Sequence, residues 1–204
     1  MKDYLTANQI KEIINENNHD MNATMNELIS IDDDYSWLNP EMQFLPEGWA
    51  SCFGAGLIHD VNYIIYNHYD EEQRESFSVA QIKEKFGELC FYADGMNAYM
   101  STLVNIYENM SQIVCIECGS MNDVTILTKG WIQPLCEQCL IKNNKAKYIN
   151  PVSSRIHDVK ADLFTYVKMD DAKHNYLDDL MKNPDNNMLT IHAYVKKLHE
   201  TYNC

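Results

Sequence analysis

Two pairs of cysteines constrain the fold of this chain more than any other feature of its sequence. Cys115 and Cys118 are separated by two residues, as are Cys136 and Cys139, and seventeen residues lie between the pairs. Two intervening residues let both sulfurs of a pair face one centre, and two such pairs complete a tetrahedron of thiolates around a metal ion. This spacing predicts zinc, although a rubredoxin-like iron site would use the same ligands.

Four thiolates leave no coordination position for water or substrate, so the predicted zinc is structural and stabilises the fold. A redox dithiol would explain one pair of cysteines but not two. The remaining cysteines, Cys52, Cys90 and Cys204, show no pairing pattern, which argues against a disulfide framework. We expect Cys52 and Cys90 to be buried thiols, because both have apolar neighbours.

The composition indicates a folded, mainly helical and strongly acidic protein. Of 204 residues 46% are hydrophobic, and glycine and proline are scarce, with seven and five residues. The formal net charge of −14 disfavours binding to membranes, and to nucleic acid unless the mildly basic C-terminal segment carries it, and favours a basic partner surface. The N-terminus lacks the apolar run of a signal peptide, and no apolar stretch is long enough to span a membrane, so we expect a cytoplasmic protein.

The chain divides into three predicted segments within an α+β class that is mainly α-helical. Residues 1–44 form an N-terminal helical arm, 45–140 a central domain with a β-hairpin and the zinc knuckle, and 141–204 a C-terminal helical segment. In the central domain, apolar periodicity predicts a helix from after Trp49 to about residue 67 and another over 96–114, the latter including Met96 on its buried face. Residues 70–75 form a charged surface connection. Strands around 77–82 and 89–92 form the hairpin, and a second, short hairpin between the cysteine pairs includes residues 124–127 and 130–132, with Trp131 packed.

Four motifs in order resemble a group of uncharacterised proteins encoded by phages and prophages of bacteria. They are Leu45-Pro46-Glu47-Gly48-Trp49, Gln81 to Gly87 with Leu89 and Phe91-Tyr92, Gly130-Trp131-Ile132, and the two cysteine pairs with Gly119. The resemblance covers residues 45–140. It departs at Glu88 and Cys90, where the family has a second glycine and a basic residue. The resemblance implies a phage setting, in which small acidic proteins commonly inhibit host defences or modify host machinery.

The first functional hypothesis is a non-enzymatic interaction protein that binds a host protein. Its acidic surface would substitute for the phosphates of nucleic acid, and the partner would be a protein with a basic nucleic-acid-binding surface. The clusters that would supply this charge are Asp32-Asp33-Asp34, Asp70-Glu71-Glu72, Asp170-Asp171 and Asp178-Asp179. An acidic surface that only keeps the protein soluble is the alternative explanation.

A second hypothesis is a protein that sequesters a small anionic ligand such as a nucleotide. Lys83 and Lys85 are two of only five lysines and arginines before residue 129, and they would gather with three aromatic residues, Trp49, Phe86 and Tyr92, around the ligand. Ion pairs with neighbouring carboxylates would explain the two lysines equally well.

A third hypothesis is a metal-dependent nuclease, in which Asp60 would act with Lys83. Glutamine at position 81 replaces the carboxylate that such a site needs, so the sequence favours a protein without enzymatic activity. Of the seven histidines, none is expected to be a ligand or a base, and we predict that residues such as His59 lie at the surface or cap helices.

Overall fold

The computed structural model describes residues 12–13, 16–17, 23, 41–127 and 131–143. These residues form a mixed α+β fold, which confirms the predicted class. Most of the predicted N-terminal arm and nearly all of the predicted C-terminal helical segment lie outside the described residues. Within the part that the structure describes, no helix has the length and apolar character needed to cross a membrane.

A continuous helical stretch forms one layer of the core, as the apolar periodicity predicts. It consists of α3 (Glu47–Trp49), a π-helical turn (Ala50–Gly54) and α4 (Ala55–His68). Pro46 precedes the first turn, where a proline is tolerated because the first amides of a helix lack partners. Every residue from Ala55 to Ile65 is buried, so most of α4 is enclosed on all sides instead of presenting one face to water.

The charged run after α4 lies at the surface, as predicted, but it forms a short helix instead of an irregular connection. A 3-10 turn (Glu41–Phe44) precedes α3, and α5 (Glu71–Ser76) follows α4. α5 begins at a capping box: the Gln73 amide donates to the Asp70 carboxylate (2.8 Å), and the Asp70 amide donates to the Gln73 side chain (3.1 Å). Arg74 donates two hydrogen bonds to carbonyls at the end of α4, which fixes α5 on that helix.

The predicted hairpin is present, and its turn is tighter than the sequence indicates. β1 (Ser78–Lys85) pairs antiparallel with β2 (Glu88–Asp94), so the turn contains only Phe86 and Gly87. Both have positive φ, 55° and 80°, as a type I′ turn requires. Glycine adopts this backbone freely, whereas it costs a phenylalanine roughly 1 kcal/mol. The Phe86 side chain is 72% exposed, so packing does not offset this cost.

The second long helix is shorter than predicted at both ends. α6 (Ala98–Ser111) begins at Asn97, whose side chain accepts a hydrogen bond from the Met100 amide (2.9 Å). Met96 therefore precedes the cap and is exposed, so its assignment to the buried face is wrong. After Ser111 the chain turns and reaches the first cysteine pair.

A small β-hairpin and a short helix complete the described fold. β3 (Val124–Leu127) pairs antiparallel with β4 (Gln133–Cys136), and α7 (Glu137–Lys142) follows directly. The second hairpin was predicted, but its second strand lies at 133–136 and not at 130–132. Trp131 is 80% exposed, so the packing role predicted for it is wrong.

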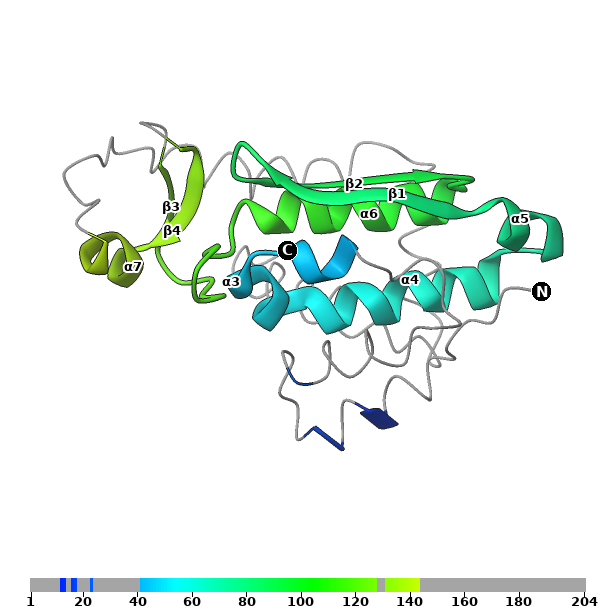
Figure 1. The fold of residues 1–204 in the computed structure, drawn as a ribbon, viewed down its shortest axis with the longest axis horizontal. Helices are drawn as coiled ribbons and strands as arrows, with labels where there is room; N and C mark the ends of the chain where they lie inside the picture. The colour runs from blue at the N-terminus through cyan, green and yellow to red at the C-terminus, as the bar shows by residue number, and fades with distance from the viewer. Residues whose placement is uncertain (1–11, 14–15, 18–22, 24–40, 128–130, 144–204) are drawn as a thin grey trace, which may run out of the picture.

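The elements stack in layers (Figure 1). The β1–β2 hairpin covers α6, and α6 in turn packs on α4, while β3, β4 and α7 lie at one end of the molecule and α5 at the other. Large side chains fill the space between the layers, among them Phe53 and Tyr107, whose ring centroids are 5.7 Å apart. Because they bury 150 Å² or more apiece, such aromatic residues dominate the energetics of a core this small.

Candidate metal centre and the surfaces around it

Four cysteine side chains meet at the end of the molecule that carries the β3–β4 hairpin, as the sequence predicts. Their Sγ atoms all lie within 4.8 Å of one another, and those of Cys118 and Cys136 are 3.5 Å apart. Sulfurs bound tetrahedrally at about 2.3 Å from one ion are about 3.8 Å apart. The cluster therefore has the dimensions of a four-thiolate metal site, with Cys118 exposed and the other three cysteines buried.

The surroundings of the four thiols act on their ionisation in opposite directions. Burial opposes ionisation of Cys115, but hydrogen bonds from the backbone at Cys136, Cys118 and Glu117 outweigh burial and lower the pKa of this thiol. Burial raises the pKa of Cys118 and of Cys139, and hydrogen bonds with neighbouring sulfurs add to the increase. Four thiolates side by side therefore need a cation to stabilise them together.

Gly48 packs against the first cysteine pair with no room for a side chain. A Cβ at Gly48 would overlap the Cys115 carbonyl oxygen and lie 2.7 Å from the Gly119 nitrogen. A Cβ at Gly119, where φ is 74°, would lie 2.7 Å from the Gly48 carbonyl oxygen. The Gly48 amide donates to the Ile116 carbonyl (3.0 Å), so the start of α3 is bonded to the cysteine loop. Both glycines are required by this close approach.

The tip of the β1–β2 hairpin contacts the same end of the molecule. A Cβ at Gly87 would lie 3.1 Å from the Ile132 carbonyl oxygen, and the Ile116 amide donates to the Pro134 carbonyl (2.9 Å). Each of the four motifs that carry the family resemblance thus contributes residues to contacts at the metal-binding end. The sequence did not predict this contact, because the motifs are far apart along the chain.

A groove with a volume of about 580 Å³ lies between these motifs. Glu84 is fixed at its wall, because its Oε1 accepts a hydrogen bond from the Gly87 amide (2.7 Å). Asn143 Nδ2 donates to both carboxylate oxygens of Glu117 (2.8 and 2.6 Å). Among the described residues, no lysine or arginine is within ion-pair distance of Glu47 or Glu84. The groove is lined by Pro46, Glu47, Glu84, Ile116, Glu117, Gln133, Lys142 and Asn143. Sequence reasoning missed this set, since its members come from five separate segments.

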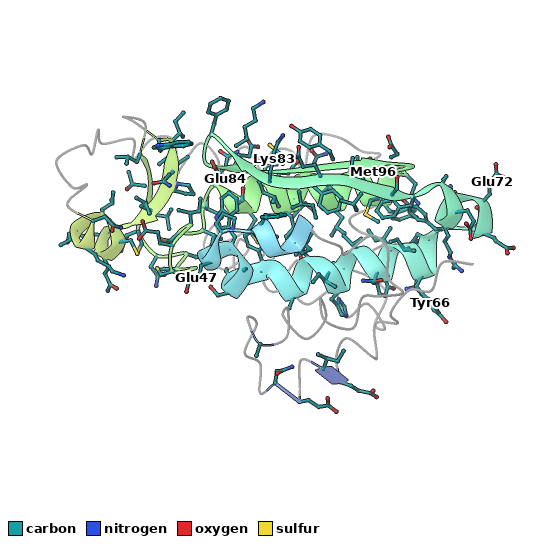
Figure 2. The ribbon with its side chains drawn as sticks, in the orientation of Figure 1. Glu47, Tyr66, Glu72, Lys83, Glu84 and Met96 are labelled. Atoms are coloured by element: carbon teal, nitrogen blue, oxygen red, sulfur yellow. The ribbon has the colours of Figure 1, made fainter. Side chains whose placement is uncertain are left out.

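Lys83, Lys85 and Tyr92 project from the outer face of the β1–β2 hairpin. The register places Lys83 opposite Cys90 and Gln81 opposite Tyr92, whereas the alternating residues of both strands are buried against α6. Lys83 Nζ lies 2.6 Å from Gln81 Oε1 and 5.3 Å from the centroid of the Tyr92 ring. Figure 2 shows the side chains on this hairpin, with Lys83 labelled.

Four of the five residues predicted to surround a ligand share this part of the molecule. Phe86 follows Lys85 at the hairpin tip, and Lys85 Nζ lies 5.6 Å from the centroid of its ring. Trp49 is the exception: it is fully buried, and its Nε1 donates to the Val114 carbonyl (3.2 Å). Trp131 was not predicted to contact a ligand, but it precedes Ile132, whose backbone lies close to Gly87. Its strong exposure in the structure marks it as a candidate binding residue.

Cys52 and Cys90 are half-buried, so the prediction of fully buried thiols is wrong. Cys90 lies on the outer face because its neighbours Leu89 and Phe91 occupy the inward positions of β2. Its hydrogen bond with Tyr92, together with nearby negative charge, raises the pKa of that tyrosine, which stays neutral at physiological pH.

A buried polar network joins α4 to α6. The Tyr107 hydroxyl donates to Asp60 Oδ2 (2.6 Å), and Asp60 Oδ1 lies 2.8 Å from His59 Nδ1. His59 and Asp60 have no exposed surface, so the prediction that His59 lies at the surface is wrong. Apolar periodicity could not reveal this, because α4 is enclosed on all sides. Asp60 on α4 faces α6, whereas Lys83 is on the outer face of the β1–β2 hairpin that covers α6, so the structure does not bring together the pair predicted for a nuclease.

Comparisons of the chain with protein-family models, with curated proteins and with solved structures find no match. The resemblance to phage-encoded proteins therefore stays a prediction. The four-cysteine cluster is the feature of that resemblance which the structure supports.

Proposed function

We propose that this protein is a non-enzymatic interaction protein that binds a basic surface of a partner protein through the acidic groove beside its metal centre. The groove carries the proposal, because it places three carboxylates, those of Glu47, Glu84 and Glu117, around a hollow of about 580 Å³. Lys142 is the one positive charge among its described lining residues. A hollow of this size accepts a lysine or arginine side chain with its neighbours.

Two of these carboxylates are held in place before any partner arrives. Glu84 accepts the Gly87 amide, and Glu117 is held by Asn143. Ordering side chains on binding costs about 0.5–1.5 kcal/mol for each, and prior fixation reduces this cost. Glu84, which accepts one amide at Oε1, keeps lone pairs for charge-assisted hydrogen bonds to a guanidinium or an ammonium group. The net charge of −14 adds long-range attraction for a basic partner.

The four cysteines hold a structural zinc ion in this proposal. Four thiolates leave no coordination position for water or substrate, so the ion supplies folding energy and no chemistry. By fixing the cysteine loop, the ion would also fix Gly48 and Pro134, whose backbones bond to that loop. The metal thereby maintains the walls of the groove.

The family resemblance suggests the setting of the interaction, namely a phage or prophage protein acting on its host. The partner would belong to a defence system or to other host machinery, and its basic surface would be one that binds nucleic acid. Of the acidic clusters predicted to imitate phosphates, the one at Asp70–Glu72 caps α5, and the other three lie outside the described residues. The groove is therefore a better-supported source of negative charge than those clusters.

Affinity purification with matched charge variants tests this function. The wild-type protein, the variant Glu47→Lys with Glu84→Gln, and the control Glu72→Lys with Glu71→Gln are each used to capture proteins from host lysate. The two variants change net charge equally, and α5 lies at the other end of the molecule.

We expect a basic partner that the control retains, that the groove variant loses, and that elutes as salt is raised. A partner retained equally by both variants would place binding outside the groove. Absence of any salt-sensitive partner would refute the proposed function.

A further inference from the structure

We infer that a second surface, formed by Lys83, Lys85, Phe86, Tyr92 and Trp131, binds single-stranded nucleic acid. We call it the hairpin surface. It consists of the outer face and tip of the β1–β2 hairpin together with Trp131, which precedes β4. The inference does not depend on the acidic groove. Its chemistry suits an unpaired nucleobase that carries a phosphate.

The aromatic rings of this surface are exposed where the fold gains nothing from them. Phe86 is 72% exposed and Trp131 80% exposed, and Tyr92 is 45% exposed. Phe86 also occupies a left-handed turn position (φ 55°) at which asparagine or glycine is preferred. A strained backbone and an exposed aromatic ring at one residue favour a role in binding over a role in folding.

The residues that carry the two most exposed rings are neighbours of one close backbone approach. Phe86 precedes Gly87 and Trp131 precedes Ile132, and Gly87 and Ile132 are in backbone contact. The rings therefore flank one contact between the hairpin and the metal-binding end. Aromatic side chains that are held in position let successive bases stack without regard to sequence.

The lysines add positive charge beside the rings. Among the described residues, neither Lys83 nor Lys85 is within ion-pair distance of a carboxylate, although Glu88 is the cross-strand neighbour of Lys85. Each ammonium instead lies over a ring, 5.3 Å from Tyr92 and 5.6 Å from Phe86. Phosphates next to stacked bases would find both ammonium groups available.

The net charge of −14 is the reason why no nucleic-acid binding was predicted from the sequence. That charge is spread over the molecule, and it acts over a longer range than the contacts of the hairpin surface. At physiological ionic strength charges more than about 8 Å away are largely screened. Among the strand residues between Gln81 and Tyr92, Glu88 is the one carboxylate that shares the outer face with the two lysines. Glu108 of α6 also approaches β2, where it accepts a hydrogen bond from the Phe91 amide. A deep pocket would favour a mononucleotide, whereas the exposed rings of Phe86, Tyr92 and Trp131 favour a strand that stacks on several of them.

Fluorescence anisotropy with labelled 15-nucleotide oligo(dT) and oligo(rU) tests the inference on the full zinc-loaded chain. We expect Phe86→Asn to weaken binding roughly 5- to 150-fold, the effect of losing one stacked base. The same variant should raise the urea midpoint, because asparagine suits the turn, so lost binding could not be attributed to unfolding. Replacement of both lysines by glutamine should reduce the slope of log K against log salt by about 1.4.

One control variant and two competition measurements accompany this assay, and four results would count against the inference. Phe44→Ala, at another exposed aromatic residue, should leave binding unchanged. No binding of either oligonucleotide by the wild type at about 50 mM salt, where phosphate contacts are strong, would overturn the inference. Unchanged binding by a folded Phe86→Asn protein would do the same. Competition by polyglutamate but not by unlabelled oligonucleotide would reassign the surface to an acidic protein, and equal affinity for a mononucleotide would reject a strand as the ligand.

Discussion

Replacement of Gly48 by alanine should separate the first helix from the metal centre. The new Cβ would overlap the Cys115 carbonyl oxygen and lie 2.6 Å from the Ile116 carbonyl carbon and 2.7 Å from the Gly119 nitrogen. All three neighbours are backbone atoms of the loop that carries the first cysteine pair. They cannot rotate away as a side chain could, so the start of α3 must shift outward.

The size of the effect follows from these contacts. Forcing extra atoms into a packed interior costs about 1–3 kcal/mol, and loss of the hydrogen bond from the Gly48 amide to the Ile116 carbonyl adds about 1 kcal/mol. We expect a decrease in the free energy of unfolding of about 2–4 kcal/mol. If the shift also strains the cysteine loop, as much as this whole free energy is lost from metal binding. Zinc affinity would then decrease by at most roughly 30- to 1,000-fold.

Urea denaturation followed by circular dichroism measures the first quantity, and competition with a chromophoric chelator measures zinc affinity. Gly95→Ala is the matched control, because Gly95 has positive φ (71°) and close backbone neighbours but lies in the loop between β2 and α6. It should lower stability without lowering the zinc affinity of the folded protein. If Gly48→Ala matches the wild type in both measurements within about 0.5 kcal/mol, the ordinary range for a surface substitution, the close approach has no structural role.

Three further substitutions test the centre, the buried network and one carboxyl group. Cys118→Ser should release the metal and unfold the central domain, as seen by metal analysis and circular dichroism; a folded but metal-free protein would contradict a structural site. Tyr107→Phe should lower the free energy of unfolding by about 1–3 kcal/mol, because a buried oxygen of Asp60 loses its donor, and a loss near zero would show that water replaces the hydroxyl. Burial raises the pKa of Glu108, because the folded protein favours the protonated carboxyl group. The contribution of Glu108 to stability is therefore present at low pH and is lost as pH rises through its folded-state pKa. Glu108→Gln, which keeps an acceptor for the Phe91 amide, should therefore match the wild type near pH 4 and be more stable at neutral pH; equal stability at both values would refute this explanation.

The sequence predicted those elements whose signals are local. Apolar periodicity located α4 and α6, alternation located the first hairpin, and spacing located the four cysteines. α5 was missed because the run that contains Asp70 and Gln73 was interpreted as a charged surface connection, although these two residues form a capping box. His59 was misplaced because periodicity distinguishes a buried face from an exposed one only when the helix has both.

The surfaces were less predictable than the elements. Glu47, Glu84 and Glu117 line one groove only because α3, β1 and the cysteine loop meet there, and no pattern within any one of those segments indicates this. Trp49 and Trp131 have similar flanking residues, a glycine before each, yet one is fully buried and the other mostly exposed. Their difference arises from tertiary contacts, which single-sequence reasoning does not reach.

The close approach of Gly48 and Gly119 also bears on the order in which the chain folds. These glycines are 71 residues apart, whereas Cys118 and Cys136 are 18 apart (119 − 48 and 136 − 118). Chain closure costs about (3/2)RT ln n, so the longer loop costs about 1.2 kcal/mol more to close. The cysteine loop and its hairpin should therefore form first, and the α3–α4 helix should dock onto them in a later, slower step.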